Sequence, residues 1–190
     1  LLKEKKDMIK EQLKKKESGI VISQDILGNQ AKFVYLSLGS NLGNKKDNIE
    51  KAKFELNQMN IKILQSSSYY ESLSWPNPKN PKFLNIVLEV TTNLRPHKLL
   101  NKCKEIEVKL GRNKSVKNSP RTCDIDIIDY NKRKITNGII LPHPRIQSRN
   151  FVLLPLFEIN KDWIHPISKH SIKRLILSLP NRDIRSIKQI

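Results

Sequence analysis

The first elements are predicted where a polar N-terminal stretch gives way to apolar residues. Residues 33–38, FVYLSL, have the apolar and aromatic character of a strand, and the glycines of residues 39–44 indicate a turn. The residues that follow keep helical spacing, with apolar positions at Ile49, Ala52, Leu56 and Met59. A strand, a loop and a helix are therefore expected in this order.

Two further strands and a second helix are predicted further along the chain. Residues 61–71 predict a strand, and residues 72–82 a long loop, because three prolines in eleven residues exclude regular structure. Residues 83–92, FLNIVLEVTT, predict the next strand. Pro96 then opens a helix that Gly111 ends. The apolar stripe of this helix consists of Leu99, Leu100, Cys103, Ile106 and Leu110.

The last part of the pattern contains a strand with alternating apolar and charged residues. Residues 112–120 are a polar loop, and residues 124–130, DIDIIDY, alternate with a period of two, which predicts a fourth strand. Residues 131–140 indicate a turn and a short returning strand. Helices are expected from about Ser148.

The predicted order from residue 33 is β-α-β-β-α-β, the ferredoxin-like arrangement. It is an α+β fold, in which an antiparallel sheet carries helices on one face. A hairpin and C-terminal helices follow. Residues 1–30 are interpreted as a Lys-rich N-terminal extension, because their predicted helix has too few apolar positions to bury a face. Residues 31–190 then form one domain of ordinary size.

Composition excludes several classes of protein. No run approaches the ~18 apolar residues of a membrane span, and the first residues lack the apolar segment of a signal peptide. Cys103 and Cys123 are too few for a disulfide scaffold and lack a zinc-ligand spacing. We therefore expect reduced thiols, a cytoplasmic location and no membrane partner.

The charge balance indicates an anionic partner. The 36 Lys and Arg exceed the 18 Asp and Glu by 18, and residues 1–30 contribute only two of these charges. Many lysines are compatible with a solvated surface. The arginines between residues 98 and 149 carry more weight, because Arg is suited to bidentate contact with phosphate.

One acidic pair lies beside two of these arginines. Asp124 and Asp126 occupy alternate positions of the strand at 124–130, so both carboxylates face the same side. Mg²⁺ takes one or two protein carboxylates and fills its other positions with water and phosphate oxygens. A bare D-x-D also fits a solvated strand face. Arg112 and Arg121 favour the metal interpretation, because guanidiniums beside such a pair are typical of a polyphosphate site.

Two further segments carry possible phosphate contacts. His143 lies between two prolines, with Arg145 and Arg149 within six residues, which favours a phosphate-facing wall. The glycines of residues 39–44 fit either phosphate contact or a tight turn. No P-loop or protein-kinase glycine loop occurs in the sequence, so a phosphoryl-type transferase would have neither of those folds.

Four sequence blocks carry a resemblance to a known family. They are SLGSNLGN from Ser37, FLN from Phe83, SPRTCDIDII from Ser119 and LPHPRIQSRNF from Leu141. In this order and spacing, the chain resembles the 6-hydroxymethyl-7,8-dihydropterin pyrophosphokinases of folate biosynthesis. The resemblance implies a ferredoxin-like enzyme that transfers the pyrophosphoryl group of ATP to the pterin hydroxymethyl oxygen. It also implies release of AMP and the use of two Mg²⁺ ions.

The resemblance assigns the ATP and metal sites to individual residues. Asp124 and Asp126 match the magnesium-binding aspartates, and His143 and Arg149 match ATP contacts. Arg112 and Arg121 match the arginines that bind the triphosphate of ATP. The set of residues implied to be catalytic is Arg112, Arg121, Asp124 and Asp126.

The resemblance also assigns a pterin site. Phe83 and Phe151 match an aromatic pair that sandwiches the pterin, and Asn85 matches an amide that reads its edge. A flat heteroaromatic is well held between two rings, and an amide can both donate and accept hydrogen bonds. Without the resemblance, both phenylalanines would be interpreted as core residues.

Two loops depart from the family pattern. Ser119 stands where the family usually has Gly or Ala, and the stretch from Arg112 to Arg121 is one residue shorter than in a well-known member and lacks a tryptophan. The loops at 72–82 and 112–120 are expected to close over the substrates. Trp75, on the first loop, covers either the pterin or the sheet.

The main alternative is a basic ferredoxin-like nucleic-acid-binding module. Such a sheet needs a strand with several exposed aromatics, and no strand of this sequence has that series; aromatics make up only 6% of the chain. We therefore expect ATP and the pterin as small-molecule substrates, no nucleic acid, and a monomer.

Overall fold

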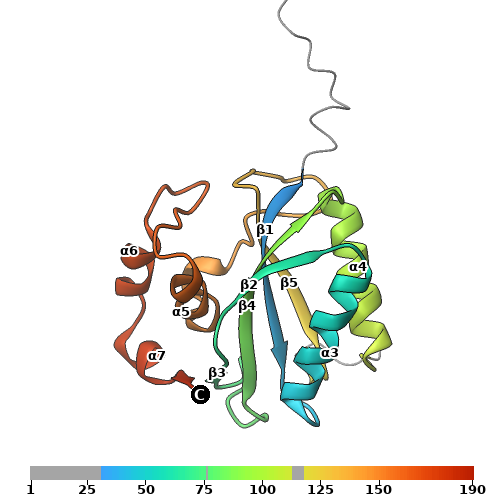
Figure 1. Ribbon diagram of the computed structural model, residues 1–190. Coiled ribbons are helices and arrows are strands. Elements are labelled where there is room, and N and C mark those ends of the chain that lie inside the picture. Colours follow the sequence, from blue (N-terminus) through green and yellow to red (C-terminus); the bar gives the residue numbers. More distant parts are fainter. Residues whose placement is uncertain (1–30, 76, 113–117) are drawn as a thin grey trace, which may run out of the picture. The chain divides into compact units, whose positions relative to one another are not determined.

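The computed structural model describes residues 31–75, 77–112 and 118–190, and it contains a central antiparallel sheet. The strand order is β5-β1-β4-β3-β6, and β2 also pairs with β4 (Figure 1). The strands are β1 (Lys32–Ser40), β2 (Lys62–Ser66), β3 (Tyr70–Ser72), β4 (Phe83–Thr92), β5 (Asp124–Tyr130) and β6 (Lys188–Gln189).

Helices cover both faces of the sheet (Figure 1). The helices are α3 (Lys45–Gln58), α4 (Pro96–Lys109), α5 (Asn150–Ile159), α6 (Ile172–Leu177) and α7 (Asn181–Arg185), with the 3-10 helix η1 (Ile146–Ser148) before α5. On one face, α3 and α4 pack against the sheet around buried residues such as Leu36 and Leu88. On the other face, α5 and α6 enclose a second apolar cluster around Val87 and Trp163.

The predicted β-α-β-β-α-β arrangement is confirmed, with β2 and β3 together in the place of its second strand and with α3 and α4 on one face. The Asn44 side chain accepts a hydrogen bond from the Asp47 backbone N (3.3 Å) and caps α3. Gly43 before it has φ +66°, a conformation that glycine adopts without strain. Pro96 begins α4, where its missing N–H leaves no hydrogen bond unmade.

The prediction of one strand at residues 61–71 is wrong, because this segment forms two strands. Ser66 of β2 lies opposite Leu88, and Tyr70 of β3 lies opposite Asn85, so this side of the ladder contains one residue more than β4. An extra residue interrupts pairing and bends the strand.

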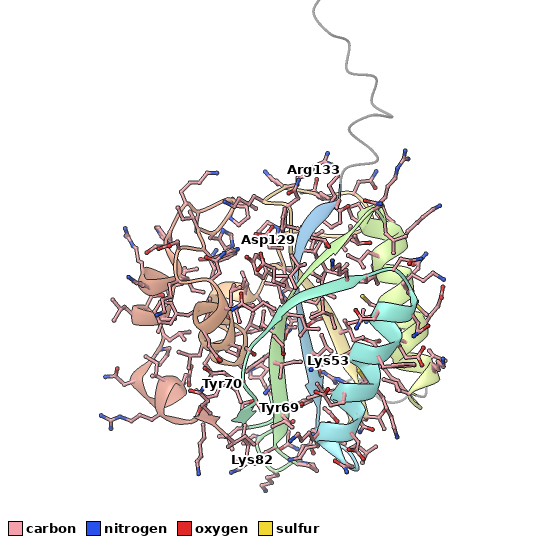
Figure 2. The ribbon with its side chains drawn as sticks, in the orientation of Figure 1. Lys53, Tyr69, Tyr70, Lys82, Asp129 and Arg133 are labelled. Atoms are coloured by element: carbon pink, nitrogen blue, oxygen red, sulfur yellow. The ribbon has the colours of Figure 1, made fainter. Side chains whose placement is uncertain are left out.

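The short segment between β2 and β3 is hydrogen-bonded to helices on both faces of the sheet. Tyr69 is the last residue of this segment, and the adjacent Tyr70 begins β3 (Figure 2). The hydroxyl of Tyr69 donates to Glu50 of α3, whereas the hydroxyl of Tyr70 donates to Oε2 of Glu158 in α5 (2.9 Å). The Ser68 hydroxyl also donates to Glu158 (2.7 Å). These contacts fix β3 immediately before the loop at 72–82.

The returning strand expected within residues 131–140 is also wrong, although the turn is present. Asn131 and Lys132 have φ values of 51° and 55° and form the tight turn that ends β5. Beyond it, a single bridge joins Ile135 to Leu141. Most side chains between them are exposed, so no buried face extends the ladder.

The C-terminal helices were predicted, but β6 was not. Its two residues pair with Tyr70 and Glu71 of β3. A strand this short has no period that a sequence could reveal. The result is that the end of the chain lies beside β3, close to the loop that follows it.

Two expectations fall outside the described residues. Residues 31–190 form one compact unit. The extension at residues 1–30 and residues 113–117 of the loop at 112–120 are not described, so the boundary at residue 31 and the closure of that loop stay predictions. Among the described helices, none combines the length and the apolar character that crossing a membrane requires.

The cysteines are free, as expected. Cys103 and Cys123 are both buried. Burial raises the pKa of each thiol to about 12, so both are protonated near neutral pH.

Candidate active site

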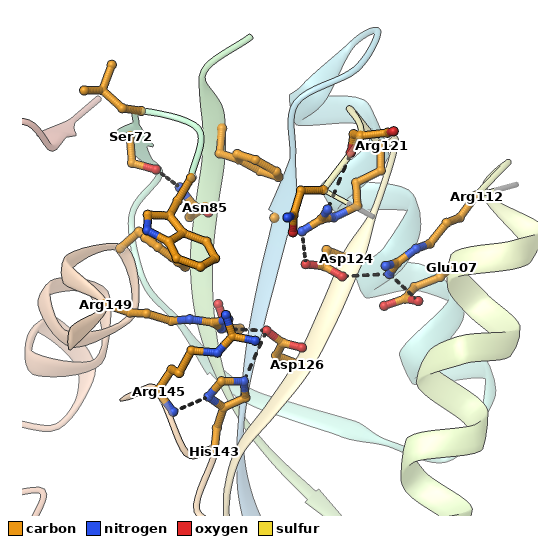
Figure 3. A pocket seen from close by; sticks show the side chains of 18 of the residues that line it. Ser72, Asn85, Glu107, Arg112, Arg121, Asp124, Asp126, His143, Arg145 and Arg149 are labelled. Carbon is orange, nitrogen blue, oxygen red and sulfur yellow. Dashed lines mark hydrogen bonds and ion pairs between the residues drawn. The ribbon is translucent and has the colours of Figure 1, made fainter. Parts of the chain in front are cut away.

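A cavity of about 820 Å³ lies where β1 ends and β4 and β5 begin (Figure 3). Its size suits a small-molecule site. All nine side chains that the sequence singled out line it: Phe83, Asn85, Arg112, Arg121, Asp124, Asp126, His143, Arg149 and Phe151.

Asp124 is held between two arginines. Its Oδ1 accepts from Nη1 of Arg112 and its Oδ2 from Nη2 of Arg121, both at 2.7 Å. Burial alone would raise the pKa of Asp124, but the charges of Arg121 and Arg112 outweigh it and hold that pKa below its usual range. Asp124 is therefore a carboxylate near neutral pH, and the two guanidiniums are fixed at one edge of the cavity.

Asp126 points into the same cavity as Asp124, as their alternate positions on β5 predict. Its Oδ2 accepts from Nη1 of Arg149 (2.8 Å) and lies 3.9 Å from Nε2 of His143. Burial and the charge of Arg149 lower the pKa of His143. The Nδ1 of His143 accepts from the Arg145 backbone N (3.1 Å), so the neutral ring carries its proton on Nε2.

The turn after β1 is hydrogen-bonded to two neighbouring segments of the cavity wall. Asn41 Oδ1 accepts from the Arg121 backbone N (2.8 Å), and Asn41 Nδ2 donates to the Pro81 carbonyl (3.1 Å). This side chain therefore connects the loop at 72–82 with the segment that carries Arg121. Of the two glycines in residues 39–44, Gly43 has the positive φ of a tight turn, whereas Gly39 still lies within β1.

The side-chain amide of Asn85 is held in one orientation by two hydrogen bonds. Its Nδ2 donates to Ser72 Oγ (2.9 Å) and to the Tyr70 carbonyl (3.2 Å). A Cβ at Gly39 would lie 3.2 Å from Asn85 Oδ1 and 3.4 Å from Phe83 Cδ1. The lack of a side chain at Gly39 thus leaves room beside both residues, which is a steric reason for glycine that the sequence did not reveal.

The two phenylalanines are half-buried and each carries a guanidinium on its ring face. Arg121 lies 5.2 Å from the ring centroid of Phe83, and Arg149 lies 5.5 Å from that of Phe151. Neither phenylalanine is fully buried in the core. Two of the arginines that bond to Asp124 and Asp126 therefore also contact the phenylalanine rings of the cavity wall.

Glu107 of α4 is a site residue that sequence reasoning missed. It is only 1% exposed, and its Oε2 lies 2.5 Å from Nη1 of Arg112. Its Oε1 accepts from the Ile125 backbone N (2.7 Å). A signal existed, because Glu107 follows Cys103 by four residues and so falls on the apolar stripe of α4. A charged residue on such a stripe indicates a buried partner.

The donor set of the cavity fits a magnesium ion. Asp124 and Asp126 offer carboxylate oxygens on one face of β5, and Mg²⁺ needs only one or two such ligands. Within the part of the chain that the structure describes, no group of three or more His, Cys, Asp or Glu side chains forms an all-protein metal cage. The pair therefore suits a cation that keeps positions for water and phosphate.

Comparison with protein families agrees with this geometry. The model of the 7,8-dihydro-6-hydroxymethylpterin-pyrophosphokinase family matches residues 35–161, about two thirds of the chain. The chain belongs to this family. The match spans β1 to α5, and so all nine predicted site residues lie inside the family region.

Relatives of this pyrophosphokinase family are found in fungi and bacteria. The folic acid synthesis protein fol1 of Pneumocystis carinii is 40% identical over 167 residues, which are 87% of this chain but only 22% of that protein. The 2-amino-4-hydroxy-6-hydroxymethyldihydropteridine pyrophosphokinase of Aquifex aeolicus is 40% identical over 141 residues, 74% of this chain and 88% of that protein. The chain thus spans about a fifth of the first relative and most of the second.

Solved structures support the fold of the family. The wild-type HPPK-DHPS of Plasmodium falciparum matches with a TM-score of 0.65 at 16% identity, covering 85% of this chain and 45% of that one. At this identity the likeness concerns the fold alone, and it agrees with the ferredoxin-like arrangement described above.

Proposed function

We propose that the chain transfers the pyrophosphoryl group of ATP to 6-hydroxymethyl-7,8-dihydropterin and releases AMP. The observation that carries this proposal is one cavity in which a carboxylate pair, held by arginines, lies beside two aromatic rings and an oriented amide. The first group suits a polyphosphate with its metal, and the second a flat heteroaromatic. Membership of the pyrophosphokinase family supports the same assignment.

In this proposal, the arginines bind the triphosphate. Asp124 orients Arg112 and Arg121 through hydrogen bonds, and Asp126 orients Arg149 in the same way. Preorganised cations stabilise charge that grows on phosphate oxygens in the transition state. His143 adds a neutral Nε2–H donor on the same wall.

Phe83, Phe151 and Asn85 would hold the pterin. The rings would stack on its two faces, and the Asn85 oxygen would accept from its edge, because the Asn85 nitrogen is already bonded to Ser72 and Tyr70. Such positioning would place the hydroxymethyl group next to the phosphate chain. It would lower the entropic cost of bringing the two reactants together.

The reaction then forms a bond from the pterin oxygen to the β-phosphorus of ATP. The bond from that phosphorus to the oxygen bridging to the α-phosphorus breaks, AMP leaves with this oxygen, and the hydroxyl proton is released to solvent. His143 is a poor candidate for the base, because its Nδ1 already accepts from Arg145 and its Nε2 carries the proton. Magnesium held by Asp124 and Asp126 would supply charge neutralisation on the phosphates.

Several finer expectations remain predictions. They are the number of two Mg²⁺ ions, the roles of the nine side chains, the monomeric state, the lack of nucleic acid as a partner, the cytoplasmic location and the division into residues 1–30 and 31–190.

The proposal is tested by AMP formation. The protein is incubated with ATP and Mg²⁺, with and without 6-hydroxymethyl-7,8-dihydropterin, and nucleotides are separated by chromatography. We expect AMP only with the pterin. The matched control is 6-methyl-7,8-dihydropterin, which keeps the ring but lacks the attacking oxygen and should yield no AMP. Equal AMP in all three reactions would refute the transfer.

A further inference from the structure

Arg145 differs from the other arginines of the cavity. Arg112, Arg121 and Arg149 each form an ion pair with Asp124 or Asp126. In the described parts of the chain, Arg145 forms no ion pair with a carboxylate. Its guanidinium instead lies over the ring of Trp75, 5.4 Å from the centroid. The charge of Arg145 is therefore not neutralised by a carboxylate.

The backbone of Arg145 is fixed, whereas its side chain is exposed. The backbone N donates to His143 Nδ1 (3.1 Å), and the carbonyl accepts from Ser148 Oγ (3.2 Å). The next residue, Ile146, is fully buried and anchors the segment. The Arg145 side chain can therefore change its partner while the Arg145 backbone stays in place.

Trp75 is the aromatic partner of Arg145 in this contact. Trp75 is 62% exposed, which is unusual for a residue with a large apolar ring, and it lines the same cavity as Arg145. The two residues come from distant segments, one after β3 and the other before η1. Figure 3 shows Arg145 beside His143 and Arg149, on the wall to which we assign phosphate binding.

The charges of the cavity favour an exchange of partner. Among the described residues that line it, five side chains are cationic and four are carboxylates, so the cations outnumber the carboxylates by one. A charge-assisted hydrogen bond to phosphate is stronger than a cation–π contact at an exposed site. An arriving triphosphate would therefore compete with the Trp75 ring for the guanidinium.

We propose that Arg145 is a further ATP-binding residue, which leaves the ring of Trp75 and binds a phosphate oxygen when ATP enters. Trp75 then changes its surroundings on ATP binding, before any pterin is present. This inference rests on the proposed function, because it takes ATP as the ligand.

Tryptophan fluorescence tests the exchange. The chain has two tryptophans, and Trp163 is buried and donates to Asp129 Oδ2 (2.9 Å), so its surroundings are fixed. Adding Mg²⁺ and ATP without pterin should change the emission of the wild-type protein. The change should be absent from Trp75→Phe, which assigns the signal, and from Arg145→Gln, which lacks the guanidinium.

Calorimetry of ATP binding supplies the second readout. Arg145→Gln should weaken ATP affinity about tenfold, as expected for the loss of one charge-assisted hydrogen bond. The matched control is Arg133→Gln, an exposed arginine that follows the other end of β5 (Figure 2). It should leave the affinity unchanged.

Two results would overturn the inference, and they differ in what they say of the proposed function. If ATP binds equally well to wild type and Arg145→Gln, and the wild-type emission does not change, Arg145 has no role in ATP binding, although the pyrophosphokinase proposal stands. If the wild-type protein binds no ATP, both proposals fail.

Discussion

Replacing Glu107 by Gln tests whether the buried carboxylate of Glu107 stabilises the protein through its ion pair with Arg112. The substitution keeps the shape of the side chain and leaves one oxygen to accept from the Ile125 backbone N. It removes the charge that pairs with Arg112 at 2.5 Å. Glu107 is 1% exposed, so water cannot replace the lost partner on this side.

The magnitude follows from what each partner loses. A hydrogen bond to a charged group contributes about 1.5–3 kcal/mol, and the full ~3–5 kcal/mol of a broken buried pair is not expected. The Arg112 side chain is 30% exposed and keeps its bond to Asp124, so it stays partly satisfied. We expect a loss of about 1.5–3 kcal/mol in the free energy of unfolding, or about 3–12 °C in Tm for a chain of this size.

Thermal and urea unfolding provide the assay, with Glu105→Gln as the matched control. Glu105 lies on the same helix and pairs with Lys102 three residues away, as Glu107 does with Lys104, but it is exposed. Its replacement should cost less than about 1 kcal/mol. If the two variants melt at the same temperature, Glu107 does not support the site as the structure indicates. A reduced turnover in Glu107→Gln would show that Arg112 has lost its orientation.

Three further changes separate the chemistry, the pterin site and the pH response. Asp126→Asn should keep the fold and lower turnover at least ~10²-fold, because an amide is a poor ligand for a hard dication; the exposed Asp162→Asn is its control, and near wild-type turnover at saturating Mg²⁺ would remove the metal role. Phe151→Ala should weaken pterin binding by about 1–3 kcal/mol and leave ATP affinity unchanged, as measured by calorimetry; a loss of ~3–5 kcal/mol in stability with unchanged pterin affinity would make Phe151 a core residue. Burial, and then the charge of His170, lower the pKa of His165, whose Nδ1 accepts from two backbone N–H groups. The contribution of neutral His165 to stability is therefore complete above about pH 6.5 and is lost as the pH falls through the lowered folded-state pKa. Urea unfolding from pH 7.5 to 5 should show a larger loss in the free energy of unfolding for the wild type than for His165→Asn. Equal losses would contradict this pH effect of His165.

The elements that sequence predicted well are those in which the local pattern and the tertiary environment agree. In β5, apolar Ile125 alternates with Asp124 and Asp126, so one period of two defined both the strand and the face of the carboxylates. The same holds for Pro96 at the start of α4, because its effect is local.

The features that sequence missed depend on residues far away in the chain. The break after β2 is defined by the register against β4, where Ser67 Oγ accepts from the Val87 backbone N (3.0 Å). No pattern within residues 61–71 contains that information. The space beside Gly39 likewise depends on Asn85 and Phe83 of the neighbouring strand. Tertiary contacts of this kind determine the finer geometry of the site.

The transfer of two phosphoryl groups as one unit is tested most directly with labelled ATP. Two reactions with Mg²⁺ and 6-hydroxymethyl-7,8-dihydropterin use ATP labelled at the β-phosphorus or at the γ-phosphorus, and the label on the pterin product is measured. We predict that both labels reach the pterin in equal amounts and that unlabelled AMP is the nucleotide product. Transfer of the γ label alone with formation of ADP, or no label on the pterin, would contradict the proposed pyrophosphoryl transfer.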